Sequence, residues 1–136
     1  MKGWESPSPA GEERRRMATF RYMVSDVEEA VAFYTEHLGF SLDQNFGPIA
    51  MVSREDLQLL LAGPKTSAAR PMPDGRIPEP GGWNRLVIQV DDLASMVETL
   101  RGRGVHFRNE IISGPGGKQI LAEDPAGKPI ELFQPA

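Results

Sequence analysis

The stretch VSDVEEAVAFYTEHLGF (24–40) decides the fold, because it joins the end of a strand to a complete amphipathic helix. Asp26 is a residue type that caps helices, and Glu29 three residues later completes a capping box. Gly39 readily adopts the positive φ at which helices end. Apolar residues recur at helical spacing between them, which indicates one buried face. We therefore predict a helix over 26–38, with a buried stripe of Val27, Ala30, Val31, Tyr34 and Leu38.

Strand patterns lie on both sides of this helix. Apolar runs of strand length, bounded by turn residues, predict one strand before the helix and three strands after it. Gly47-Pro48 and Arg54-Glu55-Asp56 supply turns between the later strands. The first half therefore has the order β-α-β-β-β. Its predicted strands cover residues 17–24, 40–46, 49–53 and 57–61.

The second half repeats this order, with its capping residue Asp92 placed 66 residues after Asp26. Self-similarity at a long, fixed period is typical of a duplicated unit. We predict an α+β fold of two tandem βαβββ modules, at about 17–62 and 83–136. The second module has a predicted helix over 92–103, a stripe of Leu93, Met96, Val97 and Leu100, and strands over 83–90, 105–112, 118–122 and 129–133.

Two segments lie outside the modules of this single domain (17–136). Residues 1–16 are rich in Pro, Ser, Gly and charge, which predicts a flexible N-terminal tail; docking of Trp4 on a partner subunit is the alternative. Residues 63–82 contain nine Gly or Pro and no periodic apolar pattern. A loop of this length is usually either functional or disordered. Both a segment that covers a site or contacts a dimer partner and a plain linker remain open.

Composition excludes several classes of function. The absence of cysteine excludes disulfides, thiolate metal sites and cysteine nucleophiles. The net charge of −4 gives no basic footprint for nucleic acid. No apolar run approaches the roughly 20 residues of a membrane span. We therefore expect a cytoplasmic protein that binds neither nucleic acid nor membranes.

Four fragments together resemble the vicinal oxygen chelate superfamily, which includes glyoxalase I, bleomycin-binding proteins, fosfomycin-resistance enzymes and extradiol dioxygenases. They are VSDVEEAVAFYTEHLGF (24–40), GGWNRLVIQVDDL (81–93), RGRGVHF (101–107) and EDPAGKPIELFQP (123–135). The resemblance implies that each module forms a curved mixed sheet and that the two sheets face a shared concave cavity. It also implies a homodimer. It does not fix the activity, because members bind metals, drugs or neither on the same frame.

The resemblance further implies the positions at which metal-dependent members place their ligands. A histidine usually lies seven residues before each capping aspartate, where this chain has Thr19 and Arg85. The last strand of each module offers Gln58 and Glu131. Of these four, only Glu131 keeps the usual ligand type, and a guanidinium cannot coordinate a cation. We therefore expect no cofactor; a divalent metal held at Glu131 is the weaker alternative.

The two histidines have structural explanations. His37 lies near the end of the predicted helix, where the helix dipole favours a partly positive imidazole. His106 lies in a predicted strand and shares a face with Arg108. We interpret neither as a metal ligand.

In the predicted strands, every second side chain points to the concave face of its sheet. The result is an apolar cavity with a few convergent polar groups, which is typical of a small-molecule site. Glu131 and Arg85 are the candidate catalytic residues. The candidate ligand-binding residues are Thr19, Arg21, Gln58, Leu60, Trp83, Val87, Gln89 and Phe133.

Several functions fit this face. The first is a binding protein for an apolar or aromatic metabolite or drug, with Trp83 and Phe133 as stacking surfaces. The second is a metal-independent lyase, isomerase or hydrolase in which Arg85 orients Glu131 as a general base or hydrogen-bond acceptor. A metal-dependent glyoxalase or dioxygenase is the third. A purely structural Arg85–Glu131 pair also fits, since a buried pair need not add stability.

Overall fold

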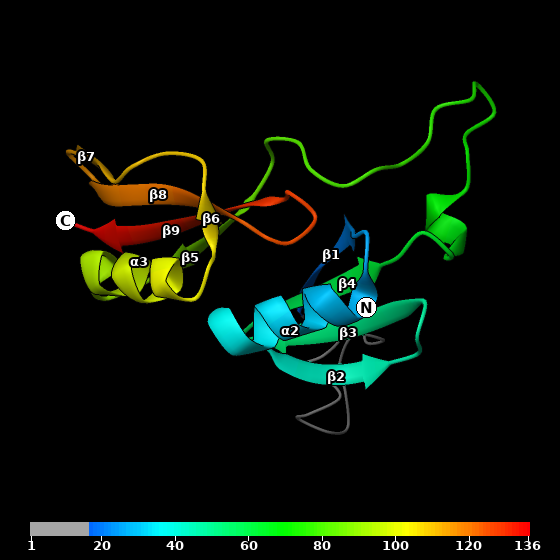
Figure 1. The fold of residues 1–136 in the computed structure, drawn as a ribbon, viewed down its shortest axis with the longest axis horizontal. Helices are drawn as coiled ribbons and strands as arrows, with labels where there is room; N and C mark the ends of the chain where they lie inside the picture. The colour runs from blue at the N-terminus through cyan, green and yellow to red at the C-terminus, as the bar shows by residue number, and fades with distance from the viewer. Residues whose placement is uncertain (1–16) are drawn as a thin grey trace, which may run out of the picture. The chain divides into compact units, whose positions relative to one another are not determined.

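The described residues, 17–136 of a computed structural model, divide between Pro78 and Glu79 into two units. In each unit one α-helix lies against one face of a mixed sheet (Figure 1). The α+β class and the repeated β-α-β-β-β order are therefore confirmed. The tail predicted for residues 1–16 lies outside the described residues. Neither helix of the described part is long and apolar enough to cross a bilayer.

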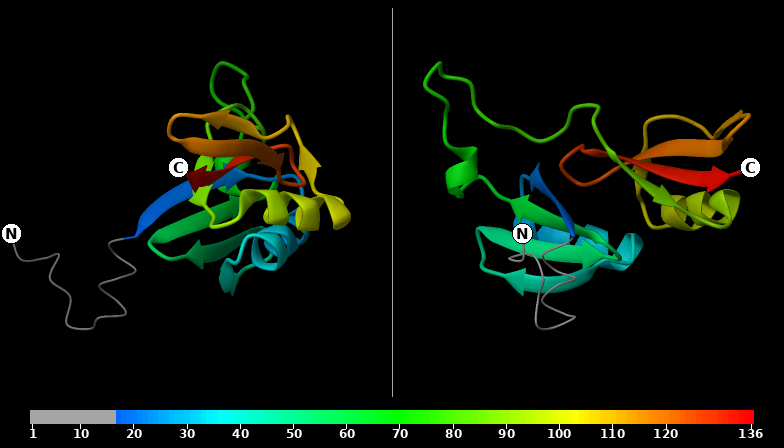
Figure 2. Two further views of the ribbon diagram at one scale, coloured as in Figure 1. Left: turned by 90° about the vertical axis from the view of Figure 1, so that its left-hand side faces the viewer. Right: turned by 180° about the vertical axis from the view of Figure 1, so that it is seen from behind.

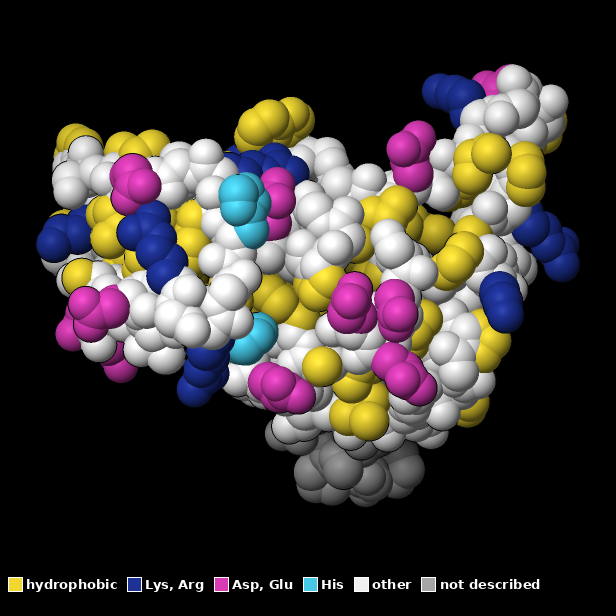
Figure 3. All heavy atoms as spheres, viewed as in Figure 1, with side chains coloured by type: hydrophobic (Ala, Val, Ile, Leu, Met, Phe, Trp, Pro, Cys, Tyr) yellow, Lys and Arg dark blue, Asp and Glu magenta, His cyan; other side chains and the backbone are white. Residues whose placement is uncertain are grey.

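The sheet of the first unit has the strand order β1-β4-β3-β2, with β1 parallel to β4 and the other pairs antiparallel. Helix α2 (Val27–His37) begins after Asp26, whose carboxylate accepts a hydrogen bond from the backbone N of Glu29 at 3.0 Å. Figure 3 shows acidic side chains gathered on the outer side of α2. The strands are β1 (Ala18–Met23), β2 (Ser41–Asn45), β3 (Ile49–Arg54) and β4 (Leu57–Ala62).

The core of the first unit lies between α2 and the sheet. Tyr34 is fully buried, and its ring meets the rings of Phe33 and Phe40 edge-on. Phe33, 6% exposed, belongs to the core although the predicted stripe left it out, whereas Val31 is only half-buried. Strand alternation places Phe20 on the helix side of the sheet, as it does Tyr22, but Phe20 is 48% exposed. It lies on the edge strand β1, while α2 packs mainly on β2, β3 and β4.

The sheet of the second unit has the order β5-β9-β8-β6, and β7 also pairs with β8. Helix α3 (Leu93–Gly102) is capped by Asp92, which accepts from the backbone N of Ser95 at 3.1 Å. Leu93, Val97 and Leu100 are buried, while Met96 of the predicted stripe is half-buried. The strands are β5 (Leu86–Gln89), β6 (His106–Phe107), β7 (Ile112–Gly114), β8 (Gly117–Glu123) and β9 (Pro129–Pro135).

Three segments differ from the sequence prediction. The strand predicted over 105–112 is interrupted, because Asn109 uses its side-chain oxygen to accept from the backbone N of Leu121 at 3.0 Å. The strand predicted over 83–90 begins only at Leu86. The segment 63–82, predicted to be without regular structure, contains a short 3₁₀ helix at Ser67–Ala69 (Figure 2).

Gly117 begins β8 in a conformation that suits only glycine. Its φ is 144°, and a Cβ at this position would collide with the backbone carbonyl of Gln134. The close approach follows from the pairing of Gly117 with Pro135 at the end of β9. The chain can therefore bring β8 and β9 together here only because this residue has no side chain.

Candidate functional site

Each sheet has a second face, opposite its helix, which we call the open face. On the open face of the second unit, Arg85 Nη2 lies 3.0 Å from Glu131 Oε1. Arg85 precedes β5 by one residue, and Val87 two residues later is the register partner of Glu131 on β9. The predicted salt bridge between Arg85 and Glu131 is therefore present. The two side chains are 29% and 11% exposed, so the pair is only partly screened by water.

The contacts of Glu131 are asymmetric. Arg85 donates from Nε at 3.2 Å and from Nη2 at 3.0 Å, and both bonds end on Oε1. Within its own unit, residues 79–136, no other residue donates a hydrogen bond to the second oxygen, Oε2. Arg85 therefore orients the carboxylate and leaves one acceptor for a donor group of a ligand.

Arg108 forms a second polar centre in this unit, which sequence reasoning did not identify as functional. Its Nε donates to Glu123 Oε2, while Nη1 and Nη2 donate to the backbone oxygens of Gly82 at 3.1 Å and Gly127 at 2.8 Å. The guanidinium also lies 4.5 Å from the ring centroid of Trp83, a cation–π contact. Trp83 is nevertheless 69% exposed. Arg108 therefore holds the indole while leaving much of it accessible.

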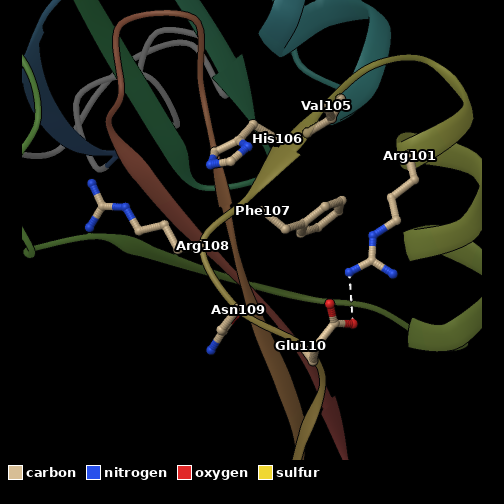
Figure 4. A pocket seen from close by; sticks show the side chains of 7 residues that line it. All are labelled: Arg101, Val105, His106, Phe107, Arg108, Asn109 and Glu110. Carbon is tan, nitrogen blue, oxygen red and sulfur yellow. Dashed lines mark hydrogen bonds and ion pairs between the residues drawn. The ribbon is translucent and has the colours of Figure 1, made fainter.

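One part of the arrangement around Arg108 could be predicted from strand alternation. It placed His106 and Arg108 on the same face, and both side chains do contact Glu123, with His106 Nε2 3.8 Å from Oε1. Figure 4 shows these two side chains on one side of the strand and Phe107 on the other. The bond from Arg108 to Gly82, 26 residues away, had no signal in the sequence.

A pocket of about 380 Å³ lies beside β6, lined by Arg101 and residues 105–110 (Figure 4). Arg101 lies over the ring of Phe107 at 5.2 Å and pairs with Glu110 at 2.9 Å. Because its guanidinium is already engaged by a ring and a carboxylate, we assign no ligand to this pocket.

The open face of the first unit carries the other predicted residues. Thr19 on β1 is the register partner of Gln58 on β4, and Arg21 is the partner of Leu60. Asp43 on β2 accepts from Ser53 Oγ at 3.0 Å and from Gln58 Nε2 at 3.4 Å. Sequence reasoning missed Asp43, because regular alternation cannot place a residue at a bulge.

The predicted ligand-binding residues of the second unit also lie on its open face. Val87 and Gln89 are exposed and alternate with the buried Leu86 and Ile88. Phe133 is the register partner of Gln89 and is half-buried. That Thr19 and Gln58 come close to Arg85 and Glu131 remains a prediction, because the two pairs belong to different units.

The residues at the family's metal positions do not fit a divalent cation. Arg85 occupies one position with a fixed positive charge and binds the carboxylate of Glu131, the only strong ligand type among the four. Gln58 offers only a neutral amide oxygen, a weak ligand, because its amide nitrogen donates to Asp43. Within residues 17–136, no group of three or more His, Asp or Glu side chains could hold a metal ion.

Comparison with known sequences agrees with the fold. The Glyoxalase/Bleomycin resistance protein/Dioxygenase superfamily model matches residues 16–132. A curated relative, the probable chloroplastic lactoylglutathione lyase of Arabidopsis thaliana, is 27% identical over 132 residues, which cover 90% of this chain. The match covers 36% of that relative, so the chain spans about a third of its length.

Solved structures give the same result. A superfamily member from Sphaerobacter thermophilus DSM 20745 has a TM-score of 0.68 and 28% identity, covering 87% of this chain and 95% of that chain. TnmS3, an antibiotic binding protein from Streptomyces sp. CB03234, has a TM-score of 0.66 and 31% identity, covering 88% and 95%. The lactoylglutathione lyase of Agrobacterium tumefaciens (TM-score 0.65, 20% identity, covering 95% and 96%) shares the fold. The chain therefore belongs to the Glyoxalase/Bleomycin resistance protein/Dioxygenase superfamily.

Proposed function

We propose that the protein binds an apolar or aromatic small molecule on the open faces of its sheets, without a metal. The observation that carries this proposal is the state of Trp83, which Arg108 holds at 4.5 Å although the indole is 69% exposed. An aromatic side chain that is already held in place loses little rotamer freedom when a ligand stacks on it. The exposed Val87 and half-buried Phe133 add apolar surface on the open face of the same unit.

The ion pair supports a polar anchor within this apolar surface. Arg85 fixes Glu131 through Oε1, so Oε2 can accept a hydrogen bond from a ligand. A mostly apolar site with a few placed polar groups is typical of small-molecule recognition. TnmS3, described as an antibiotic binding protein, is 31% identical over most of the chain and supports the binding of a drug-like molecule.

Glu131 favours a second candidate, a metal-independent lyase, isomerase or hydrolase. An oriented carboxylate with one oxygen available can remove a proton from a bound substrate, and the neighbouring guanidinium can stabilise negative charge that develops on it. The relation to a probable lactoylglutathione lyase supports enzymatic activity in the family. In this candidate Glu131 is the general base and Arg85 its positioning residue.

A ligand screen tests both candidates. The full chain is heated with members of a panel of aromatic metabolites and drugs, and a bound compound at a hundred times its Kd should add about 2.7 kcal/mol to the free energy of unfolding. Mass spectrometry of the recovered compound then separates binding, which leaves it unchanged, from catalysis, which alters its mass or structure. The proposal is wrong if no aromatic compound stabilises the protein. It is also wrong if each bound compound stabilises the Trp83→Ala variant as much as it stabilises the unaltered protein.

A further inference from the structure

A β-bulge places Asp43 on the open face of the first unit. Leu42 pairs with Val52 and Gln44 pairs with Met51, so Asp43 is one extra residue in β2. Bulges redirect side chains and are frequent beside functional sites. Here the bulge brings the carboxylate to Ser53 on β3 at 3.0 Å and to Gln58 on β4 at 3.4 Å.

This carboxylate determines which atoms its neighbours present to a ligand. An ionised carboxylate can only accept hydrogen bonds, so Ser53 must give it the hydroxyl proton and Gln58 must give it an amide proton. The Oε1 atom of Gln58 and the remaining lone pairs of Ser53 are then left as acceptors. Without Asp43, the amide of Gln58 could turn and present its donor instead.

Register places these acceptors in one row across three strands. Thr19 on β1 and Ser53 on β3 are both partners of Gln58 on β4. Because neighbouring strands are about 4.8 Å apart, the row spans roughly 10 Å, close to the length of a two-ring aromatic. The next row on this face pairs Leu60 with Met51 and with Arg21, so apolar side chains lie beside the polar row.

We propose that Asp43 is a specificity-determining residue, which makes this face select apolar or aromatic molecules that carry hydroxyl or amino donors along one edge. The proposal rests on the proposed binding function and adds the chemical class of the ligand. The apolar body lies over Leu60 and Met51, while the donors meet Gln58 and Ser53. The negative charge of Asp43 disfavours ligands with a carboxylate at the same edge.

A pair of matched probes tests this polarity. Isothermal titration calorimetry with the full chain compares 1,5-dihydroxynaphthalene, which donates hydrogen bonds, with 1,5-dimethoxynaphthalene, which cannot. The unaltered protein should bind the diol at least about tenfold more tightly than the ether. Asp43→Asn should lower this ratio to about threefold or less, because an Asn amide can accommodate either orientation of Gln58. Asp56→Asn, which removes the same charge from an exposed turn of the same sheet, should keep the ratio.

A second variant tests the acceptor itself and does not depend on the folding of the first. Gln58→Met keeps the side-chain length and removes the acceptor, so affinity for the diol should fall about tenfold while affinity for the ether stays within about twofold. Equal affinity of the unaltered protein for both probes, or an unchanged ratio in Asp43→Asn and Gln58→Met, overturns this inference and leaves the proposed function standing. Binding of neither probe also overturns this inference, whereas the proposed function fails only if no compound of the aromatic panel stabilises the protein.

Discussion

Arg85 donates two hydrogen bonds to Glu131, and both end on one oxygen, Oε1, at 3.2 Å from Nε and 3.0 Å from Nη2. A symmetric fork would have engaged both carboxylate oxygens. The observed geometry instead leaves Oε2 to accept from a ligand, while the guanidinium supplies the opposite charge. The pair can therefore serve both the stability of the unit and the recognition of a ligand, and variants can separate these two roles.

The double variant Arg85→Met/Glu131→Gln separates them. Glu131→Gln alone leaves a partly buried guanidinium unpaired and should lower the free energy of unfolding by about 1–3 kcal/mol, less than for a fully buried pair because Arg85 is 29% exposed. The double variant should regain most of this stability in urea titrations. Binding or turnover of a ligand found in the screen should stay lost. A stable double variant with full binding or activity would show that neither residue belongs to the site.

Metal content is the second prediction. Protein purified without chelator should contain far less than one zinc, nickel, iron or manganese ion per chain, measured by elemental analysis. The reason is that Thr19 and Arg85 stand at the positions of two expected histidines, and that Arg85 already engages Glu131. A content near one ion per chain that disappears in Glu131→Ala would contradict this prediction.

The third prediction concerns Arg108. Arg108→Ala should release the indole of Trp83 and weaken the binding of an aromatic ligand about tenfold. The reason is that the entropy cost of immobilising Trp83 is then subtracted from the free energy of binding. Arg108→Lys should not restore binding, since an ammonium lacks the fork that reaches Gly82, Gly127 and Glu123 at once.

Arg101→Ala is the matched control for this experiment, because Arg101 also covers a ring and pairs with an acidic side chain, but at Phe107 and Glu110. Its affinity for the ligand should be unchanged. Quenching of Trp83 fluorescence by acrylamide, in a Trp4→Phe background, should increase in Arg108→Ala alone. Equal quenching in both variants would argue against a positioning role for Arg108.

The helix caps give the fourth prediction. Asp92→Ala removes the acceptor for the backbone N of Ser95 and should lower the free energy of unfolding by about 1 kcal/mol. Asp91→Ala, an exposed neighbour with the same charge, should change it by less than about 0.5 kcal/mol. Chemical denaturation measures both. Similar losses in the two variants would mean that charge, rather than the cap, stabilises α3.

Local chemistry explains what the sequence could predict. Asp26 and Asp92 cap their helices as expected, because a cap depends on residues only three positions apart. The Arg85–Glu131 pair could be predicted because the family resemblance puts both residues at ligand positions and strand alternation puts both on one face; the structure adds the parallel register that brings Val87 beside Glu131. These features need no knowledge of distant segments beyond the order of the strands.

The features that the sequence did not reveal depend on irregular backbone. Asp43 reaches Gln58 only because one extra residue in β2 shifts the register, and apolar periodicity cannot locate such a shift. Arg108 reaches Gly82 through the course of a segment rich in Gly and Pro. Phe33 is buried because the rings of Tyr34 and His37 surround it, which widens the apolar stripe beyond the predicted one.

The close approach of β8 and β9 at Gly117 also limits how this protein can vary. A Cβ there would overlap the carbonyl oxygen of Gln134, an atom of the backbone that cannot rotate away, whereas a Cβ at Gly116 or Gly114 would meet nothing within 4 Å. Of three glycines in four residues, only the last has no permissible replacement. The turn between β7 and β8 can therefore change at positions 114 and 116, by drift or by design, while position 117 stays glycine.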